Sequence, residues 1–175
     1  MISRRPWLAV ALLPFLTFGA CADAPGGADP LAPDAALLAS RGPTLVECPT
    51  STSEATTGTL GTLGGSISLN GHRMTLPLFA VLLPTEFRLE APVSRFMELD
   101  ITANGMDSFD FQKAVTITID YSRCTRSDIE GQALTVWQID PVTKDLIEPM
   151  GGFDDKIART ITFTTDHLST YSLAR

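Results

Sequence analysis

The sequence predicts an all-β protein, an antiparallel β-sandwich with Greek-key-like connections that follows a disordered N-terminal tether. Three observations lead to this fold class. Apolar and polar residues alternate in several short segments, most regularly in residues 115–121, and this period of two is typical of strands with one face in a core and the other in water. Asn70-Gly71 separates two such segments, as in a two-residue hairpin turn. After residue 48 no window repeats its apolar residues with the period of a helix.

The first expected element is an export signal over residues 1–20. Arg4 and Arg5 precede an apolar run over residues 7–18, and the small residues Gly19 and Ala20 follow. This order of basic, apolar and small residues is typical of a secretory signal, and the apolar run is shorter than a permanent transmembrane helix requires. The sequence therefore predicts an exported protein.

Cys21 comes directly after this signal. Residues 18–21 resemble a bacterial lipobox, in which the cysteine is lipidated on its sulfur and becomes the new N-terminus. The alternative is ordinary signal cleavage after Ala22 or Ala24. Lipidation of Cys21 would anchor the chain stably in a membrane. We therefore expect a bacterial cell-envelope protein, periplasmic or held at the outer membrane by its lipid anchor.

Residues 21–47 are expected to form the lipidated cysteine and a flexible linker. Ala, Pro, Gly and Asp dominate residues 22–44, and such a composition cannot bury a core. Without residues 1–20 the chain keeps 20 acidic and 11 of its 13 basic residues, a formal charge of −9. This charge would repel phosphates, so nucleic acid is not expected as a partner.

Cys48 and Cys124 are the remaining cysteines. An even number in an exported chain predicts a disulfide between them, with two buried free thiols as the alternative. Two sulfur ligands are too few for a zinc site. No metal and no cofactor is expected.

The predicted β-sandwich domain covers residues 48–175. Trp137 belongs to a segment that is apolar on both faces, which favours a place in the core. The expected strands are residues 66–69, 73–76, 86–91, 97–102, 115–121, 134–139, 146–149, 159–164 and 168–173.

Three segments also resemble a known family. Residues 62–65 (TLGG), 76–81 (LPLFAV) and 167–171 (HLSTY) are similar, in this order, to landmarks of the ZU-five domain of zona-occludens proteins, netrin receptors and ankyrins. The resemblance covers about residues 57–174 and includes small bacterial lipoproteins with a single such domain. Phe79 stands where the family pattern has glycine, and Leu168 where phenylalanine is common. The resemblance implies a β-sandwich used for protein–protein contact without catalytic activity.

The triplet His167-Leu168-Ser169 has two interpretations. Some relatives of this family cut themselves between the apolar residue and the serine of such a triplet, so Ser169 would attack the Leu168 carbonyl with His167 as general base. Residues i and i+2 of a regular strand lie about 6.5 Å apart, too far for a direct hydrogen bond between nucleophile and base. We therefore expect a structural last strand, with His167 packed at its start, and no enzyme activity.

Other functions have weaker support in the sequence. Asp100, Asn104, Asp107 and Asp110 carry oxygen ligands, but their spacing fits no calcium loop and favours a solvated loop between strands. The expected partner is a protein at the cell envelope. A carbohydrate-binding sandwich is the second alternative after self-cleavage, and it would require several exposed aromatic residues on a sheet face.

Overall fold

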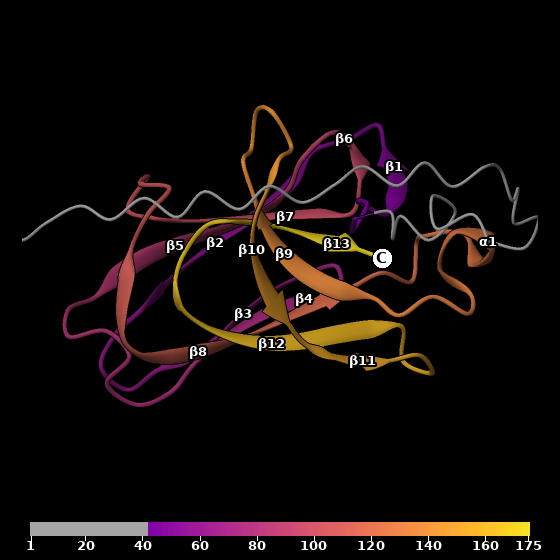
Figure 1. Ribbon diagram of the computed structural model, residues 1–175. Coiled ribbons are helices and arrows are strands. Elements are labelled where there is room, and N and C mark those ends of the chain that lie inside the picture. Colours follow the sequence, from indigo (N-terminus) through magenta and orange to yellow (C-terminus); the bar gives the residue numbers. More distant parts are fainter. Residues whose placement is uncertain (1–41) are drawn as a thin grey trace, which may run out of the picture. The chain divides into compact units, whose positions relative to one another are not determined.

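The computed structural model describes residues 42–175, except for the side chain of Asp128, and this part of the chain is almost entirely β-structure (Figure 1). The predicted signal, the Cys21 lipidation site and most of the predicted linker lie outside the described residues. The elements are β1 (Glu47–Thr50), β2 (Glu54–Leu60), β3 (Gly65–Leu69), β4 (His72–Leu76), β5 (Thr85–Ala91), β6 (Ser94–Phe96), β7 (Glu98–Ala103), β8 (Asp110–Asp120), α1 (Arg126–Ile129), β9 (Thr135–Ile139), β10 (Leu146–Gly151), β11 (Phe153–Asp155), β12 (Thr160–His167) and β13 (Thr170–Ala174).

Two large antiparallel sheets form a β-sandwich, which confirms the predicted fold class. One sheet has the strand order β10-β9-β13-β7-β5-β2, and the other has the order β11-β12-β8-β4-β3. A short third sheet pairs β1 with β6. Strands that are neighbours in a sheet are often distant in the sequence, so the chain crosses repeatedly between the two layers.

The core lies between the two large sheets, and it follows the predicted alternation most clearly in β8. Val115, Ile117 and Ile119 are fully buried, and the residues between them are partly exposed. These three residues pair in register with Thr165, Phe163 and Ile161 of β12. Trp137 differs from the prediction, because it is only half-buried next to the fully buried Val136.

The chain closes both open sides of the sandwich by passing from an edge strand of one sheet to an edge strand of the other. On one side only Gly152 separates β10 from β11. On the other side a four-residue turn joins β2 to β3, with Gly61 and Gly64 paired across it. Both crossings join the outermost strands of the two sheets.

Residues 44–46 belong to the sandwich, although the sequence analysis places them in the linker. Leu45 pairs with Ala174 of β13, and Thr44 and Arg175 exchange two backbone hydrogen bonds of 2.9 Å. Val46 is fully buried, and its N–H donates to the carbonyl of Leu173 at 2.8 Å. This segment continues along β13 beyond the point where the pairing of β13 with β7 ends.

Candidate functional site

The triplet His167-Leu168-Ser169 forms a corner where the chain passes from β12 in one sheet to β13 in the other. Leu168 and Ser169 are the two connecting residues, so the predicted strand over residues 168–173 begins only at Thr170. The buried Tyr171 donates a hydrogen bond of 2.7 Å from its hydroxyl to the carbonyl of His167. A tyrosine that bonds backbone a few residues upstream is the tyrosine-corner device of Greek-key sandwiches. The corner therefore has a structural explanation.

His167 uses its ring for contacts other than Ser169. Its Nδ1 lies 3.0 Å from Asp166 Oδ1, and its Nε2 lies 3.2 Å from Gln138 Oε1 of β9. The buried Thr165 hydroxyl donates to the His167 carbonyl at 2.9 Å. No hydrogen bond between the His167 ring and Ser169 occurs in the described part of the chain. Self-cleavage after Leu168 stays a prediction, and its proposed base is held by other partners.

Cys48 and Cys124 form the predicted disulfide, with Cα atoms 4.9 Å apart and a sequence separation of 76. The bond joins β1 to the segment that precedes α1. It therefore holds the start of the sandwich to the loop that carries the only helical turn among residues 42–175.

The acidic segment over residues 100–110 runs from β7 into β8 of the other sheet, through a two-residue turn at Asn104-Gly105. Asn104 and Gly105 have φ values of 51° and 74°, and Ala103 pairs with Met106 across them. Asn104 also accepts the N–H of Glu86 on its side-chain oxygen at 3.1 Å. Asp100 accepts a hydrogen bond of 2.7 Å from the hydroxyl of Thr170. Within residues 42–175 no group of three or more acidic, histidine or cysteine residues is arranged to hold a metal ion.

One end of the sandwich exposes a group of large apolar side chains that the sequence analysis did not identify. We call this group the apolar tip: Leu63, Leu78, Phe79, Leu82 and Leu83. Their exposed fractions run from 49% for Leu78 and Phe79 to 85% for Leu63, so they contribute to the surface and not to the core. The tip combines the turn between β2 and β3 with the loop between β4 and β5, and the N–H of Phe79 bonds the carbonyl of Thr62 at 2.8 Å.

Phe79 has a left-handed backbone conformation, with φ of 63°. This conformation is costly for a residue with a bulky side chain, and glycine adopts it freely. The pattern of the resembled family has glycine at this position. Lys113 supports the loop, because its Nζ donates to the Leu78 carbonyl at 3.0 Å and lies 5.5 Å from the centre of the Phe79 ring.

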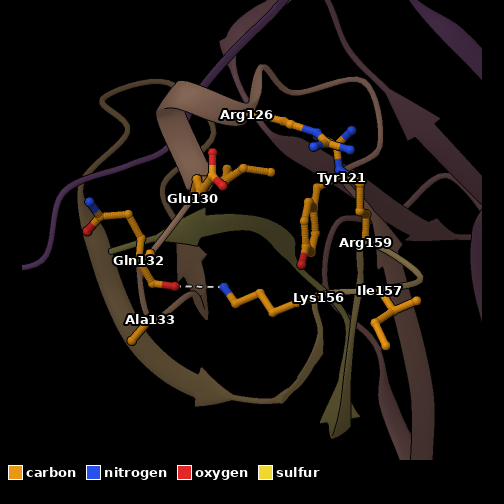
Figure 2. Close-up of a pocket in the computed structure, with 10 residues that line it drawn as sticks. Tyr121, Arg126, Glu130, Gln132, Ala133, Lys156, Ile157 and Arg159 are labelled. Carbon is orange, nitrogen blue, oxygen red and sulfur yellow. Dashed lines mark hydrogen bonds between the residues drawn. The ribbon is translucent and has the colours of Figure 1, made fainter.

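A second feature is a cavity of about 700 Å³ between α1 with its following loop and the turn between β11 and β12 (Figure 2). We call it the cationic pocket. Its lining residues are Tyr121, Arg126, Ile129, Glu130, Gly131, Gln132, Ala133, Lys156, Ile157 and Arg159. Figure 2 shows Glu130, Gln132 and Ala133 on one wall and Tyr121, Arg159 and Ile157 on the opposite wall. Its volume lies within the range of about 300–1,000 Å³ for small-molecule sites.

Polar contacts hold the walls of the cationic pocket. Lys156 reaches across it, donating from Nζ to the carbonyl of Gln132 at 2.6 Å and contacting Asp154 Oδ2 at 2.5 Å. The Tyr121 hydroxyl donates to Asp154 Oδ1 at 2.5 Å. Burial and the neighbouring Asp154 raise the pKa of Tyr121, so this phenol stays protonated. Tyr121 therefore acts as a hydrogen-bond donor in the pocket wall and not as a base.

A smaller cavity of about 300 Å³ lies beside the hairpin turn of β3 and β4. His72 lines it, is 2% exposed, and accepts the N–H of Asp120 on Nδ1 at 3.1 Å. Burial, with the positive charge of Arg123, lowers the pKa of His72 to about 4. His72 is therefore neutral at neutral pH, and the hydrogen bond from Asp120 places its ring proton on Nε2.

The comparisons with known proteins assign the chain to no family. No protein-family model matches the chain, and no curated protein is significantly similar to it. In residues 42–175 the only helix is a single short turn, and nothing helical there could cross a membrane.

Proposed function

We propose that this protein is an exported, lipid-anchored binding module of a bacterial cell envelope, which contacts a protein partner through its apolar tip. The observation that carries this proposal is the exposure of the tip. Leu82 and Leu83 are 62% and 74% exposed, and Leu63, next to the Thr62 carbonyl that accepts the N–H of Phe79, is 85% exposed. Large apolar side chains exposed on neighbouring loops are typical of an interaction site in a soluble domain.

The position of the tip also supports contact with a partner. Residues 44–46 and Arg175 lie together beside the end of β13, and the disulfide of the nearby Cys48 connects this end to Cys124, just before α1. The apolar tip follows the end of β4, whereas the Asn70-Gly71 turn at its start lies beside Asp120 and Arg123. The tip is therefore at the end of the sandwich remote from the point where the N-terminal segment enters (Figure 1).

The net charge of the chain indicates the chemistry of the proposed partner. The chain without residues 1–20 carries a formal charge of −9, from 20 acidic and 11 basic residues. Such a charge is repelled by an anionic lipid surface, so insertion of the tip into a bilayer is disfavoured. A protein with an apolar site surrounded by basic side chains would complement both the tip and the charge.

The proposed location has a separate test, an intact mass of the protein purified from bacterial membranes. We expect acyl mass on Cys21 and a gain of two hydrogens on reduction of Cys48–Cys124. A chain that begins with Met1 and carries no lipid would contradict export and anchoring. Loss of residues 169–175, absent in a Ser169→Ala variant, would instead establish self-cleavage after Leu168.

The proposed contact is tested with a photocrosslinking residue placed at position 82 or 83 in cells. We expect one discrete protein adduct from each tip position and none from position 142, where Val142 is 84% exposed at a distant loop. The adduct partner is then purified, and its affinity for a Leu82→Ser/Leu83→Ser variant should fall at least about tenfold. A Val142→Ser control should bind like the wild type.

Equal adducts from positions 82 and 142 would contradict the role of the tip. Adducts with lipid alone would replace the protein partner with a membrane surface. Adducts between two copies of the chain would make the tip a dimer interface. Binding of polysaccharide that survives the tip substitutions would favour the carbohydrate-binding alternative.

A further inference from the structure

The cationic pocket has a charge opposite to that of the whole chain. Three of its lining side chains are cationic, Arg126, Lys156 and Arg159, and one is anionic, Glu130. The whole chain has 20 acidic and 13 basic residues. A local excess of positive charge inside a cavity attracts anions more strongly than the same charges on a flat surface.

Two of the three cations are not neutralised by an ion pair with a described carboxylate. Lys156 is paired with Asp154 at 2.5 Å. Arg159 donates from Nη2 to the backbone carbonyl of Cys124, which leaves its charge in place. Among the side chains that the structure describes, Arg126 has no carboxylate within ion-pair distance. Guanidinium groups offer paired N–H donors that match the geometry of carboxylates and other oxyanions.

Apolar groups complete the pocket. Ile129 is buried in its wall, and Ile157 is 98% exposed at its rim. Asp155 fixes the turn that carries Ile157, because its Oδ1 accepts the N–H groups of Ile157 and Ala158 at 2.9 Å each. A fixed turn that holds a large apolar side chain in water offers it as a contact for an apolar ligand surface.

Arg159 has an unfavourable backbone conformation beside the pocket, with φ of 57°. Asparagine or glycine would adopt this conformation at lower cost. Unfavourable backbone conformations of this kind occur preferentially where a site needs a particular side chain. Arg159 donates a hydrogen bond to the Cys124 carbonyl and also lines the pocket. Its backbone conformation therefore places one side chain where it both supports the wall and takes part in the ligand site.

We propose that the cationic pocket binds a small organic anion, a carboxylate or a related oxyanion on an apolar body. The anionic group lies between Arg126 and Arg159, and the apolar body packs against Ile129 and Ile157. Tyr121 belongs to the wall beside Arg159, and its hydroxyl donates to Asp154. This site is separate from the apolar tip in both residues and chemistry.

The test compares two fluorescent probes that share their aromatic rings and differ in charge. 8-Anilinonaphthalene-1-sulfonate carries a sulfonate, and N-phenyl-1-naphthylamine is neutral. Each is titrated into the full domain with its disulfide intact, and the site is located by amide chemical-shift changes in NMR spectra. We expect the sulfonate probe to shift residues 129–133 and 156–159 and to bind more tightly than the neutral probe.

An Arg126→Met variant keeps an unbranched apolar stem at this position and removes the guanidinium group with its charge. It should weaken the sulfonate probe about tenfold and leave the neutral probe unchanged, since a hydrogen-bonded charge at a partly exposed site contributes about this much. An Arg73→Met variant, altered at an exposed arginine of β4, is the matched control and should bind like the wild type.

Several results would overturn the proposal. These are equal affinity for both probes, an unchanged sulfonate affinity in Arg126→Met, and shifts confined to residues 62–64 and 78–83, which would show that the probe binds the apolar tip. The Leu82→Ser/Leu83→Ser variant separates the two sites. It should keep the sulfonate affinity whether or not the tip binds a protein partner.

Discussion

Among residues 42–175, five residues other than glycine have a positive φ, and only three of these conformations are explained by the turn or ion pair in which the residue takes part. Asn70 and Asn104 occupy two-residue turns, where asparagine tolerates this conformation. Lys144 is held by an ion pair of 2.7 Å with Glu98, which is 1% exposed and requires a partner. Within the described chain, no ion pair with a buried charge holds Phe79 or Arg159 in this backbone conformation. They lie in the apolar tip and in the cationic pocket, the two surfaces for which we propose binding.

His72 makes the stability of the fold depend on pH. Its pKa is lowered from 6.5 to about 4 by burial, so the folded protein binds a proton less readily than the unfolded chain. The stabilisation is complete above pH 6.5 and is lost progressively as the pH falls from 6.5 to 4. Below pH 4 the loss from this residue reaches its limit.

A His72→Gln variant tests this dependence, because glutamine can accept the N–H of Asp120 and does not titrate. Between pH 7.5 and pH 4.5 we expect the free energy of unfolding of the wild type to fall by about 2–3 kcal/mol more than that of the variant. Urea denaturation at the two pH values measures both. Parallel losses in the two proteins would show that His72 titrates normally in the folded state.

At the scale of elements, two Asn-Gly dipeptides form two-residue turns, and the first of them fixes the register of the β3–β4 hairpin. Asn70-Gly71 places Leu69 opposite His72, as the sequence predicts. Asn104-Gly105 places Ala103 opposite Met106, but the acidic residues around it led to a different interpretation of that segment. The same dipeptide signal was therefore present in both places.

Gly71 and Gly105 form a matched pair for mutation. Both have a positive φ, 89° and 74°, but a Cβ at Gly105 meets open space, whereas a Cβ at Gly71 would collide with the carboxylate of Asp120. Asp120 cannot move freely, since it accepts the N–H of Ser122 at 2.7 Å. We expect Gly105→Ala to cost about 1–2 kcal/mol of unfolding free energy and Gly71→Ala at least about 1 kcal/mol more. Thermal or urea denaturation measures the difference, and equal costs would contradict the collision.

The strands that could be predicted are those with clear alternation. The expected ranges overlap nine strands of the structure, β3, β4, β5, β7, β8, β9, β10, β12 and β13, although β8 begins at Asp110 and not at Val115. β2 escaped prediction because its sequence EATTGTL contains few large apolar residues, and most of its residues are exposed or half-exposed at the edge of a sheet. β6 and β11 have three residues each and α1 has four, which is too short for a period to show.

At the scale of the molecule, the disulfide limits the freedom of the unfolded chain. Cys48 and Cys124 are 76 positions apart, and closing a loop of this length corresponds to about 4 kcal/mol in the chain-entropy treatment. We expect a Cys48→Ala/Cys124→Ala variant to lose about 2–5 kcal/mol of unfolding free energy, measured by urea denaturation. Wild type with reductant should approach the variant. A change below about 1 kcal/mol in both would contradict this role.

The candidate sites were harder to predict than the fold, since each joins segments that are distant in the sequence. The apolar tip combines Leu63 with Leu78, Phe79, Leu82 and Leu83, and nothing in the sequence alone indicates that these residues are exposed. The cationic pocket combines residues 121–133 with 156–159, which share no motif. Arg126 and Arg159 line one pocket only because the fold brings α1 close to the turn after β11.

The pairing of Thr44 with Arg175 brings the two ends of the described chain side by side at one point of the sandwich. A domain whose ends lie side by side can be inserted into a loop of another protein without forcing the two ends of that loop apart. It can also be circularly permuted, with a short peptide joining Arg175 to Thr44 and new ends opened in the exposed turn at Val142. Such a permuted chain would present the same binding surfaces while its point of attachment moved to a different side of the molecule.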